Sequence, residues 1–258
     1  MDQAAEQAFR EREQRLKDAV QLKTPDRVPI SMGLNYFPAK FTGTTTWAAY
    51  YDFPNWKQAY IKAARYYEPD RLLVVPNQSG NVLEALDAHQ LRWPGHGVSR
   101  YHTHQFVEGE YMKGDEYDLL LNDTSDFLVR RYLPRVYGIL APAGKLPPLN
   151  MLMTMLPFNT LASPEFIGML EKLTQVAKEA VQWQTETASL VRELTGLGYF
   201  CRNAPFMAGA PFDSISDFLR GMRGTMLDMY RCPDKLLRAC EMMCRIQLER
   251  IAQLPQAT

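Results

Sequence analysis

The sequence predicts an α/β fold built on a parallel sheet, and two observations carry this prediction. Between residues 28 and 75, a strand pattern, a helical pattern and a second strand pattern follow one another, which is the order of a βαβ unit. Farther along, a helical pattern over residues 164–194 precedes a third apolar stretch at 199–206. Strands that alternate with helices are typical of parallel sheets, because each crossover needs a helix's length of chain.

Composition narrows the class of protein. The 258 residues are 46% hydrophobic, enough for one large core or two small ones, and 29 basic side chains balance 29 acidic ones. A net charge of zero argues against a nucleic-acid partner. The polar first residues lack a signal peptide, and the longest apolar run, 151–158, is shorter than the ~20 residues of a membrane helix. We therefore expect a cytoplasmic protein with no membrane partner and with four free thiols.

The first quarter of the chain reads as helix, strand, helix and strand. Residues 2–22 have a charged helical pattern, and residues 28–34 form a short apolar strand. A second helix is expected over 56–67, where Glu68-Pro69 ends it, and a second strand over 71–75.

The middle of the chain departs from this alternation. We expect an inserted β-hairpin whose strands, 89–93 and 101–111, flank the turn 94–97. Shorter features surround it: helical turns at 81–86, helices at 115–121 and 125–132, and an irregular connection with six prolines at 134–164.

The segment 210–243 reads as a loop, a helix, a short break and a second helix. Ser214 and Asp217 have the spacing of a capping box, and Gly221 and Gly224 suggest close packing, because glycine otherwise destabilises a helix by roughly 1 kcal/mol. Pro233 begins the next helix. The apolar stripe expected on the first helix comprises Ile215, Phe218, Leu219, Met222, Met226 and Met229.

Three segments carry a resemblance to a known family. They are RLKDAVQLKTPDRVPISMG near the start, EYMKGDEYDLLLNDTSDFLVRRYLPR at 110–135 and PFDSISDFLRGMRGTMLDMYRCPDKLLRAC at 211–240. In this order they resemble the uroporphyrinogen decarboxylase superfamily, which holds tetrapyrrole decarboxylases and corrinoid-dependent methyltransferases. The resemblance implies that residues 1–258 are a single domain of the (β/α)₈ TIM-barrel class.

The length of the chain and the number of strands predict that this barrel is incomplete. A (β/α)₈ barrel needs eight strands, whereas three are evident here, and relatives continue through further strands beyond the last helix. We therefore expect a partial (β/α)₈ TIM barrel with an inserted β-hairpin and long helices, an N-terminal fragment without its C-terminal strands. Uncovered apolar edges should make such a chain aggregate or form a homodimer.

Barrel enzymes bind their substrates at the carboxyl ends of the strands, which gives the candidate site for a small-molecule substrate. The candidates are Asn35 and Tyr36 after the first strand, Asn77, Gln78 and Ser79 after the second, and Met207 and Asp213 after the third. Amides suit a neutral polar ligand, although they also cap turns, and Asp213 has the alternative role of a helix cap. Tyr36 can stack on a flat ligand or belong to the core.

The resemblance allows more than one activity. The family's decarboxylases carry arginines after the first strand and an aspartate after the second, whereas here Lys40 is the only cation in the first loop and VVPNQSGN has no carboxylate. These departures favour corrinoid-linked methyl transfer in the complete form, with a corrinoid protein as partner. The alternatives are uroporphyrinogen decarboxylation, which needs no cofactor, and a non-catalytic fragment or binding module.

Metal ligands are not evident in the sequence. The methyltransferases of the family that act on thiols use a zinc ion. The resemblance implies that its ligands lie in the part of the barrel that this chain lacks. We therefore expect zinc and a corrinoid only in the complete protein. His102 and His104 would share one face of a strand, but a solvated hairpin face explains that spacing as well. The catalytic residues are not identified, and we expect the chain alone to be inactive.

Overall fold

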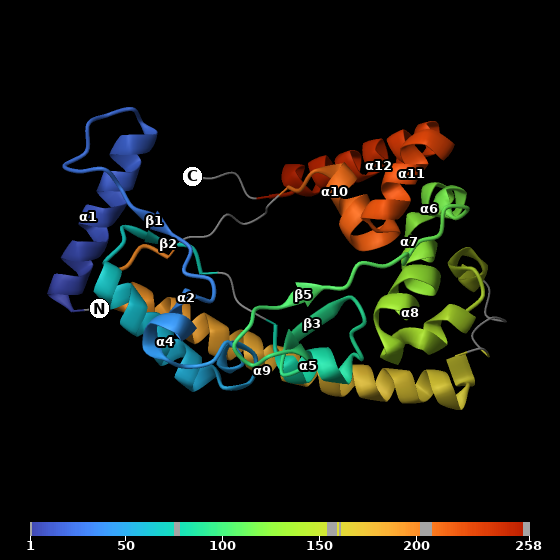
Figure 1. The fold of residues 1–258 in the computed structure, drawn as a ribbon, viewed down its shortest axis with the longest axis horizontal. Helices are drawn as coiled ribbons and strands as arrows, with labels where there is room; N and C mark the ends of the chain where they lie inside the picture. The colour runs from blue at the N-terminus through green and yellow to red at the C-terminus, as the bar shows by residue number, and fades with distance from the viewer. Residues whose placement is uncertain (1, 75–77, 154–158, 160, 202–207, 255–258) are drawn as a thin grey trace. The chain divides into compact units, whose positions relative to one another are not determined.

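The computed structural model describes residues 2–74, 78–153, 159, 161–201 and 208–254. These residues are mostly helical with a few short strands, an α/β-like mixture in which no TIM barrel is evident (Figure 1). They group into two compact units. Unit 1 holds residues 1–82, 93–104 and 177–204, and unit 2 holds 83–92, 105–176 and 205–258. The assignment of one domain to the whole chain stays a prediction.

Unit 1 begins with the predicted helix, a strand and a short helical region. Helix α1 (Gln3–Val20) begins at Asp2, whose carboxylate accepts a hydrogen bond from the Ala5 N–H at 2.8 Å. Strand β1 (Ser31–Met32) precedes α2 (Phe37–Thr42) and α3 (Ala48–Tyr51).

The rest of unit 1 consists of a long helix, a strand and the end of another long helix. Helix α4 (Phe53–Tyr67) starts three residues earlier than predicted, because Asp52 caps it. Strand β2 (Arg71–Leu72) follows, and α5 (Gly80–Ala85) starts in this unit. Helix α9 (Pro164–Gly196) extends two residues past its predicted end and contributes its last part here.

The three predicted strands lie in parallel, as a βαβ arrangement requires. β1 pairs with β2 through Ser31↔Arg71 and Met32↔Leu72, and the bridge Arg71↔Phe200 adds the third segment on the other side of β2. Figure 1 shows β1 and β2 side by side. Val75 and residues 202–206 of the predicted strands lie outside the described residues. The parallel sheet is thus confirmed on a smaller scale.

Strand β1 is shorter than the predicted 28–34 because a buried carboxylate binds the chain just before it. Asp70, fully buried, accepts the Ile30 N–H at 2.7 Å, so this N–H is not free for a sheet ladder. Arg27 donates two hydrogen bonds to the same carboxylate at 2.6 and 2.7 Å, and Arg15 completes the ion-pair network. Val28 stays 82% exposed as a result, which a buried strand would not allow.

The predicted hairpin exists in a reduced form. Strand β3 (Leu91–Pro94) pairs antiparallel with β5 (Gln105–Phe106) and also pairs with β4 (Gly97–Val98). Residues 102–104 are not part of a strand, so the expectation that His102 and His104 share one strand face is wrong. The backbone oxygens of Arg100 and His102 instead accept hydrogen bonds from the buried Thr46 hydroxyl at 2.8 and 2.6 Å.

Unit 2 consists of short helices and two longer ones. The two predicted helices before residue 133 correspond to α6 (Tyr117–Asn122), α7 (Thr124–Phe127) and the π-helix η1 (Leu128–Tyr132). The described part of the connection predicted to be irregular contains short helices: α8 (Leu133–Val136) and the 3₁₀ helices η2 (Gly138–Lys145) and η3 (Leu149–Met153). The unit ends with α10 (Pro211–Ile215), the π-helix η5 (Ser216–Arg220), α11 (Met222–Arg231) and α12 (Pro233–Ala252).

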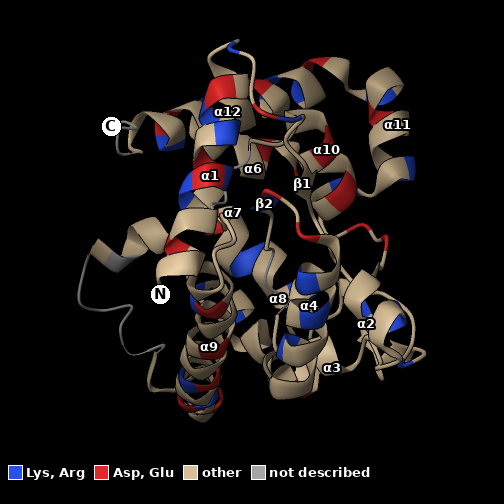
Figure 2. Ribbon diagram, turned by 90° about the vertical axis from the view of Figure 1, so that its left-hand side faces the viewer, with Lys and Arg blue, Asp and Glu red and all other residues tan. Residues whose placement is uncertain are grey.

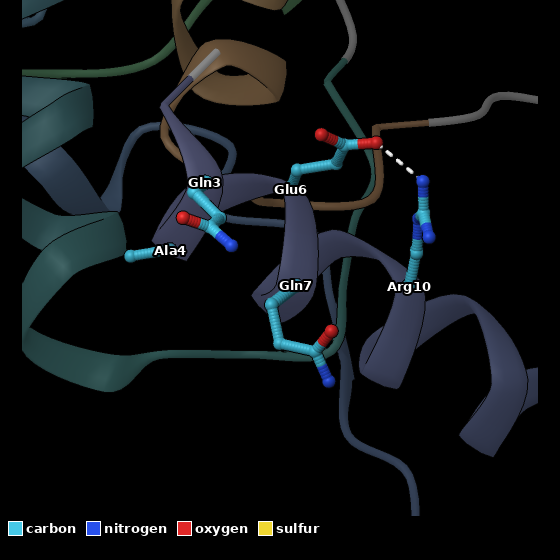
Figure 3. A pocket seen from close by; sticks show the side chains of 5 residues that line it. All are labelled: Gln3, Ala4, Glu6, Gln7 and Arg10. Carbon is cyan, nitrogen blue, oxygen red and sulfur yellow. Dashed lines mark hydrogen bonds and ion pairs between the residues drawn. The ribbon is translucent and has the colours of Figure 1, made fainter.

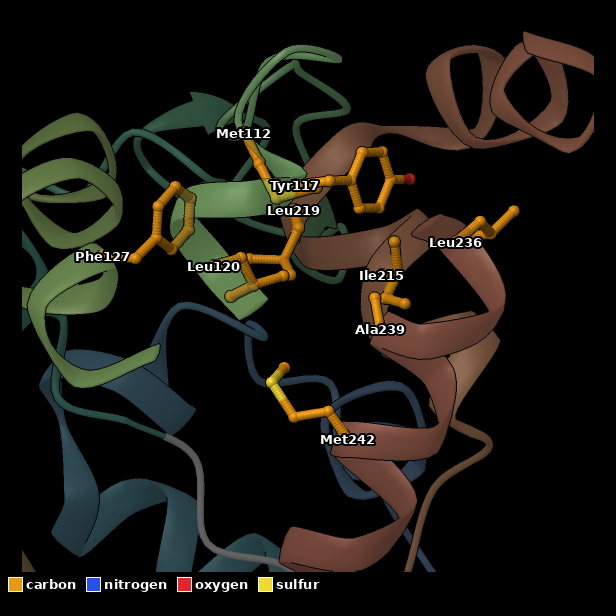
Figure 4. Packing of buried hydrophobic residues seen from close by; sticks show 9 residues of the cluster. All are labelled: Met112, Tyr117, Leu120, Phe127, Ile215, Leu219, Leu236, Ala239 and Met242. Carbon is orange, nitrogen blue, oxygen red and sulfur yellow. The ribbon is translucent and has the colours of Figure 1, made fainter. Parts of the chain in front are cut away.

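The core of unit 2 joins α6, α7, α10, η5 and α12 (Figure 4). Its buried members are Met112, Tyr117, Leu120, Phe127, Ile215, Leu219, Leu236, Ala239 and Met242. A second, smaller cluster holds Ala143, Leu146, Phe166 and Met169. Burial of these side chains supplies the main driving force for folding this unit.

Two expectations for the segment 210–243 are wrong. Ser214 lies inside α10 rather than at its cap, because the helix already starts at Pro211. Gly221 has φ +73° and separates η5 from α11, which resets the helical phase. Met222 and Met226 are therefore about half exposed, instead of continuing the stripe of Ile215 into the core.

The prediction of close packing at Gly224 is confirmed. A Cβ atom there would lie 3.0 Å from the Arg220 guanidinium, whose Nε donates to the Asp228 carboxylate at 2.6 Å. The side chains of both charged residues are at least 96% buried. The absence of a side chain at Gly224 makes room for this pair.

Candidate functional site

The carboxyl edge of the three parallel segments is the candidate site. The Leu73 N–H donates to the Met32 carbonyl at 2.9 Å, and the Leu72 N–H donates to the Phe200 carbonyl at 3.0 Å. Parallel strands end at the same edge, so Gly33, Leu73 and Cys201, the described residues next after β1, β2 and Phe200, lie at one edge of this sheet. Ligands in α/β proteins bind beyond such carboxyl ends.

The two candidate residues after β1, Asn35 and Tyr36, differ in their exposure to solvent. Asn35 is exposed and adopts φ +43°, a left-handed conformation that asparagine tolerates. Tyr36, the next residue, is half-buried and precedes α2, where Pro38 lies in the first turn. Tyr36 therefore turns inward while Asn35 remains open to solvent.

Of the residues predicted after β2, the structure describes two. Gln78 is exposed and Ser79 is buried. Asn77, and Met207 after the third strand, lie outside the described residues. Their assignment to the site stays a prediction.

Asp213 belongs to unit 2. It is exposed in the first turn of α10, where a carboxylate interacts favourably with the helix dipole. Ala210 occupies the cap position, so the alternative that Asp213 caps this helix is wrong. Its role as a pocket carboxylate stays a prediction.

Tyr36 is part of a hydrogen-bonded triangle that we call the Tyr–Tyr–His triad: Tyr36, Tyr50 and His104. The two hydroxyl oxygens are 2.6 Å apart. His104 Nδ1 lies 2.8 Å from the Tyr36 hydroxyl and 2.9 Å from that of Tyr50. The two tyrosine rings are stacked with an interplanar angle of 7°, and the imidazole meets Tyr36 edge-on.

Local structure holds each member of the triad. Tyr50 lies on α3 and is 2% exposed. The loop that carries His104 is fixed by the Thr46 hydroxyl, four residues before Tyr50. Trp56 packs against the Tyr36 ring at a centroid distance of 6.3 Å. The triad is thus supported from two helices and a loop.

Burial keeps all three groups neutral near pH 7. It raises the pKa of Tyr36 and of Tyr50, because a phenolate loses its hydration inside the protein. It lowers the pKa of His104, since the imidazolium is disfavoured for the same reason. A neutral histidine between two hydroxyls can accept a proton or pass one on.

A carboxylate that was not predicted from the sequence lies beside Ser79. Glu179 of α9 accepts hydrogen bonds from the Ser79 hydroxyl at 3.4 Å and from the Asn81 side-chain amide at 3.3 Å. The Ser79 hydroxyl also accepts the Val82 N–H at 3.4 Å, so this side chain caps the first turn of α5. One hundred residues separate Ser79 from Glu179, and no local signal in the sequence connects them.

A half-buried thiol, that of Cys201, follows Phe200. Burial raises the pKa of the Cys201 thiol to about 11, so it is protonated at neutral pH. Tyr60 lies nearby, and its hydroxyl donates to the Leu73 carbonyl at 3.4 Å. Burial raises the pKa of Tyr60, and a negative charge on Cys201 would raise that pKa further. All four cysteines are free thiols, as expected. Cys201 is a neutral neighbour of the edge rather than a nucleophile.

The described part of the chain contains no set of metal-binding side chains. No group of three or more His, Cys, Asp or Glu side chains there is placed to hold a metal ion. His102 is exposed, whereas the half-buried His104 faces the two tyrosines, so the description of both as a solvated hairpin face is wrong for His104. His102 and His104 therefore do not form a zinc site.

Two surface hollows lie apart from the predicted residues. One, of about 600 Å³, is lined by Gln3, Ala4, Glu6, Gln7 and Arg10, all on one face of α1 (Figure 3). The other, of about 320 Å³, is lined by residues of α4 and by Glu193 of α9. Both acidic and basic residues occur along α1 and α9 (Figure 2). Neither hollow contains a member of the triad.

No described helix has the length and apolar character of a membrane span. Comparison of the chain with protein-family models, with curated proteins and with solved structures gives no match.

Proposed function

We propose that the chain is a uroporphyrinogen decarboxylase-like protein of the cytoplasm that binds a small molecule at the carboxyl edge of β1 and β2. The proposed activity is corrinoid-linked methyl transfer, with a corrinoid protein as partner. The observation that supports this proposal is the parallel arrangement of β1, β2 and Phe200, with Tyr36 of the Tyr–Tyr–His triad on the segment that follows β1. Hydrogen-bonding side chains at such an edge are the usual ligand contacts of α/β proteins.

The charge of the edge favours methyl transfer over decarboxylation. A porphyrinogen substrate carries several carboxylates, and a protein that binds it needs cations at their positions. The described residues of the edge instead offer an amide at Asn35, another at Gln78 and hydroxyls at Tyr36 and Ser79. Glu179 adds a negative charge near Ser79, which would repel carboxylates. A neutral ligand suits these groups better.

Two binding and turnover measurements test the proposal together. The purified chain is titrated with cobalamin by equilibrium dialysis, and in a separate assay it is incubated with uroporphyrinogen while coproporphyrinogen is measured. We expect binding of the corrinoid or of a corrinoid protein, and no decarboxylation. Sustained formation of coproporphyrinogen would overturn the order of the two activities, and absence of any corrinoid binding would remove the support for methyl transfer.

The location of the site has a test of its own. Replacing Asn77 with alanine should weaken binding of the small molecule by about 1–3 kcal/mol, because a polar group of the ligand loses its partner. The melting temperature should change little. A loss of stability without a loss of affinity would show that Asn77 supports the loop instead of the ligand.

A further inference from the structure

We infer that the hollow between α4 and the last part of α9 is a binding site for a small phosphate monoester. The hollow has a volume of about 320 Å³ and is lined by Gln58, Ile61, Lys62, Arg65 and Glu193, all of unit 1. Its volume is at the low end of the roughly 300–1,000 Å³ of ligand pockets. None of its lining residues belongs to the carboxyl edge of the sheet, so this inference goes beyond the proposed function.

The exposed polar face of α4 lines the hollow. The opposite face of this helix is at most 4% exposed and comprises Trp56, Ala59, Tyr60, Ala63 and Ala64. Because successive residues of an α-helix are rotated by about 100°, Gln58, Lys62 and Arg65 lie within about 60° of one another on the side away from these buried residues. Burial of one face thus fixes the direction in which the other face presents its side chains.

The charge beside the hollow is positive. Helix α4 contains Lys57, Lys62 and Arg65 and no acidic residue (Figure 2). Within the described part of the chain, the side chains of Lys62 and Arg65 form no hydrogen bond or ion pair, not even with Glu68 at the end of the helix. The carboxylate of Glu193 is paired with Lys57 at 2.5 Å. Three positive charges and one negative charge leave a net charge of +2 for Lys57, Lys62, Arg65 and Glu193.

A phosphate monoester matches this charge and its spacing. It carries a charge of about −1.5 to −2 at pH 7 on a single group. Lys62 and Arg65 are three residues apart, which is about 4.5 Å along the helix axis, so one phosphate group can contact both side chains. The guanidinium donates two parallel hydrogen bonds to phosphate oxygens, and the ammonium acts as a point charge. A dicarboxylate has the same total charge but divides it between two separate groups.

The rest of the lining indicates what the phosphate is attached to. Gln58 lies one turn before Lys62, about 6 Å along the axis, and its amide both donates and accepts hydrogen bonds. Ile61, 9% exposed, adds apolar surface between them. Glu193 would repel a second anionic group on the ligand. The ligand that fits these groups is the phosphate monoester of a small alcohol with further hydroxyl groups.

Calorimetric titration of the purified chain with glycerol 3-phosphate, inorganic phosphate and succinate tests the inference. We expect one molecule of glycerol 3-phosphate to bind per chain, more tightly than either of the other two probes. Lys62→Gln and Arg65→Gln should each weaken this binding at least about tenfold, because each removes a charge-assisted contact. Arg65→Lys should also weaken it, since lysine cannot donate two parallel hydrogen bonds. Gln58→Ala should weaken glycerol 3-phosphate and leave inorganic phosphate unchanged.

Two further variants separate the site from a general effect of charge. Glu193→Gln removes the negative charge from the lining and releases Lys57, so it should strengthen the binding of glycerol 3-phosphate. Lys178→Gln makes the same change of charge as Lys62→Gln at an exposed position of α9, fifteen residues or about 22 Å from Glu193 along the helix. It should leave the affinity unchanged. Circular dichroism establishes that each variant is folded.

Four outcomes would overturn the inference. They are no saturable binding of glycerol 3-phosphate by the folded wild-type chain, equal affinity in Arg65→Gln, an equal loss in Lys178→Gln and Lys62→Gln, and binding of succinate as tight as that of glycerol 3-phosphate. Binding to vesicles that contain phosphatidic acid, without binding of glycerol 3-phosphate, would assign the basic face to a membrane and overturn it as well. The corrinoid-binding test of the proposed function is independent of all these outcomes.

Discussion

Replacing Asp228 with alanine removes the counter-ion of the most deeply buried arginine in unit 2. Arg220 is 3% exposed, and its Nε and Nη2 donate to the two Asp228 oxygens at 2.6 and 3.2 Å. The Tyr117 hydroxyl donates to the same carboxylate at 3.0 Å. In the variant the guanidinium keeps the Met112 carbonyl and the exposed Glu110, 3.4 Å away, while the buried phenol loses its acceptor.

The expected loss follows from the cost of leaving a charge buried. Removing one partner of a buried ion pair destabilises a protein by about 3–5 kcal/mol. For a unit of this size that corresponds to a fall in melting temperature of roughly 6–20 °C. The control is Asp118→Ala, which breaks the exposed pair with Lys235 and should cost no more than about 1 kcal/mol.

Urea denaturation followed by far-UV circular dichroism measures both variants. A double-mutant cycle with Arg220→Met isolates the interaction, because the loss caused by Asp228→Ala should be smaller once the guanidinium is gone. We expect a coupling free energy of about 1–3 kcal/mol between Arg220 and Asp228. A coupling below about 0.5 kcal/mol, or equal losses for Asp228→Ala and Asp118→Ala, would refute the reasoning.

Three further predictions concern thiols, pH and exposed apolar groups. Iodoacetamide at pH 8 should modify the exposed Cys244 long before Cys201, whose thiol has a pKa of about 11, as peptide mass analysis can measure. Burial lowers the pKa of His104, so on acidification the unfolded chain binds a proton at a higher pH than the folded chain does. The free energy of unfolding that neutral His104 contributes is therefore complete above about pH 6.5 and is lost as the pH falls below it. His104→Gln should reduce the dependence of the unfolding free energy on pH, measured by urea titrations at several pH values. The half-exposed Met222 and Met226 should bind a hydrophobic dye and support the expected homodimer, and changing both to glutamate should lower dye fluorescence and the molar mass by light scattering.

Local signals in the sequence were enough for the longer helices, whereas α2 and α3 were not predicted. Asp52 before α4, Gly196 at the end of α9 and Pro233 at the start of α12 act through neighbours one turn away, so start and stop residues predict these elements within a few positions. The parallel pairing of β1 and β2 was also predictable, because the helix between them leaves few other connections.

The extent of β1 and the buried face of α11 were not predictable in this way. Asp70 captures the Ile30 N–H from forty residues away and shortens the strand. At Gly221 a positive φ changes the helical phase, so that Asp228 and Thr225 face inward where periodicity placed Met226 and Met229. Hydrophobic periodicity assumes one uninterrupted helix, and a single backbone dihedral invalidates it.

The sequence by itself determined the longer helices, the parallel strands and one member of the triad, Tyr36, through its place after the first strand, but not α2 and α3. Tertiary structure alone decided its partners: Tyr50 and His104 are fourteen and sixty-eight residues away, and Glu179 is one hundred residues from Ser79. Such contacts form only when elements that are far apart in the sequence pack together. A local pattern of residues does not determine which side chains then come within hydrogen-bond distance.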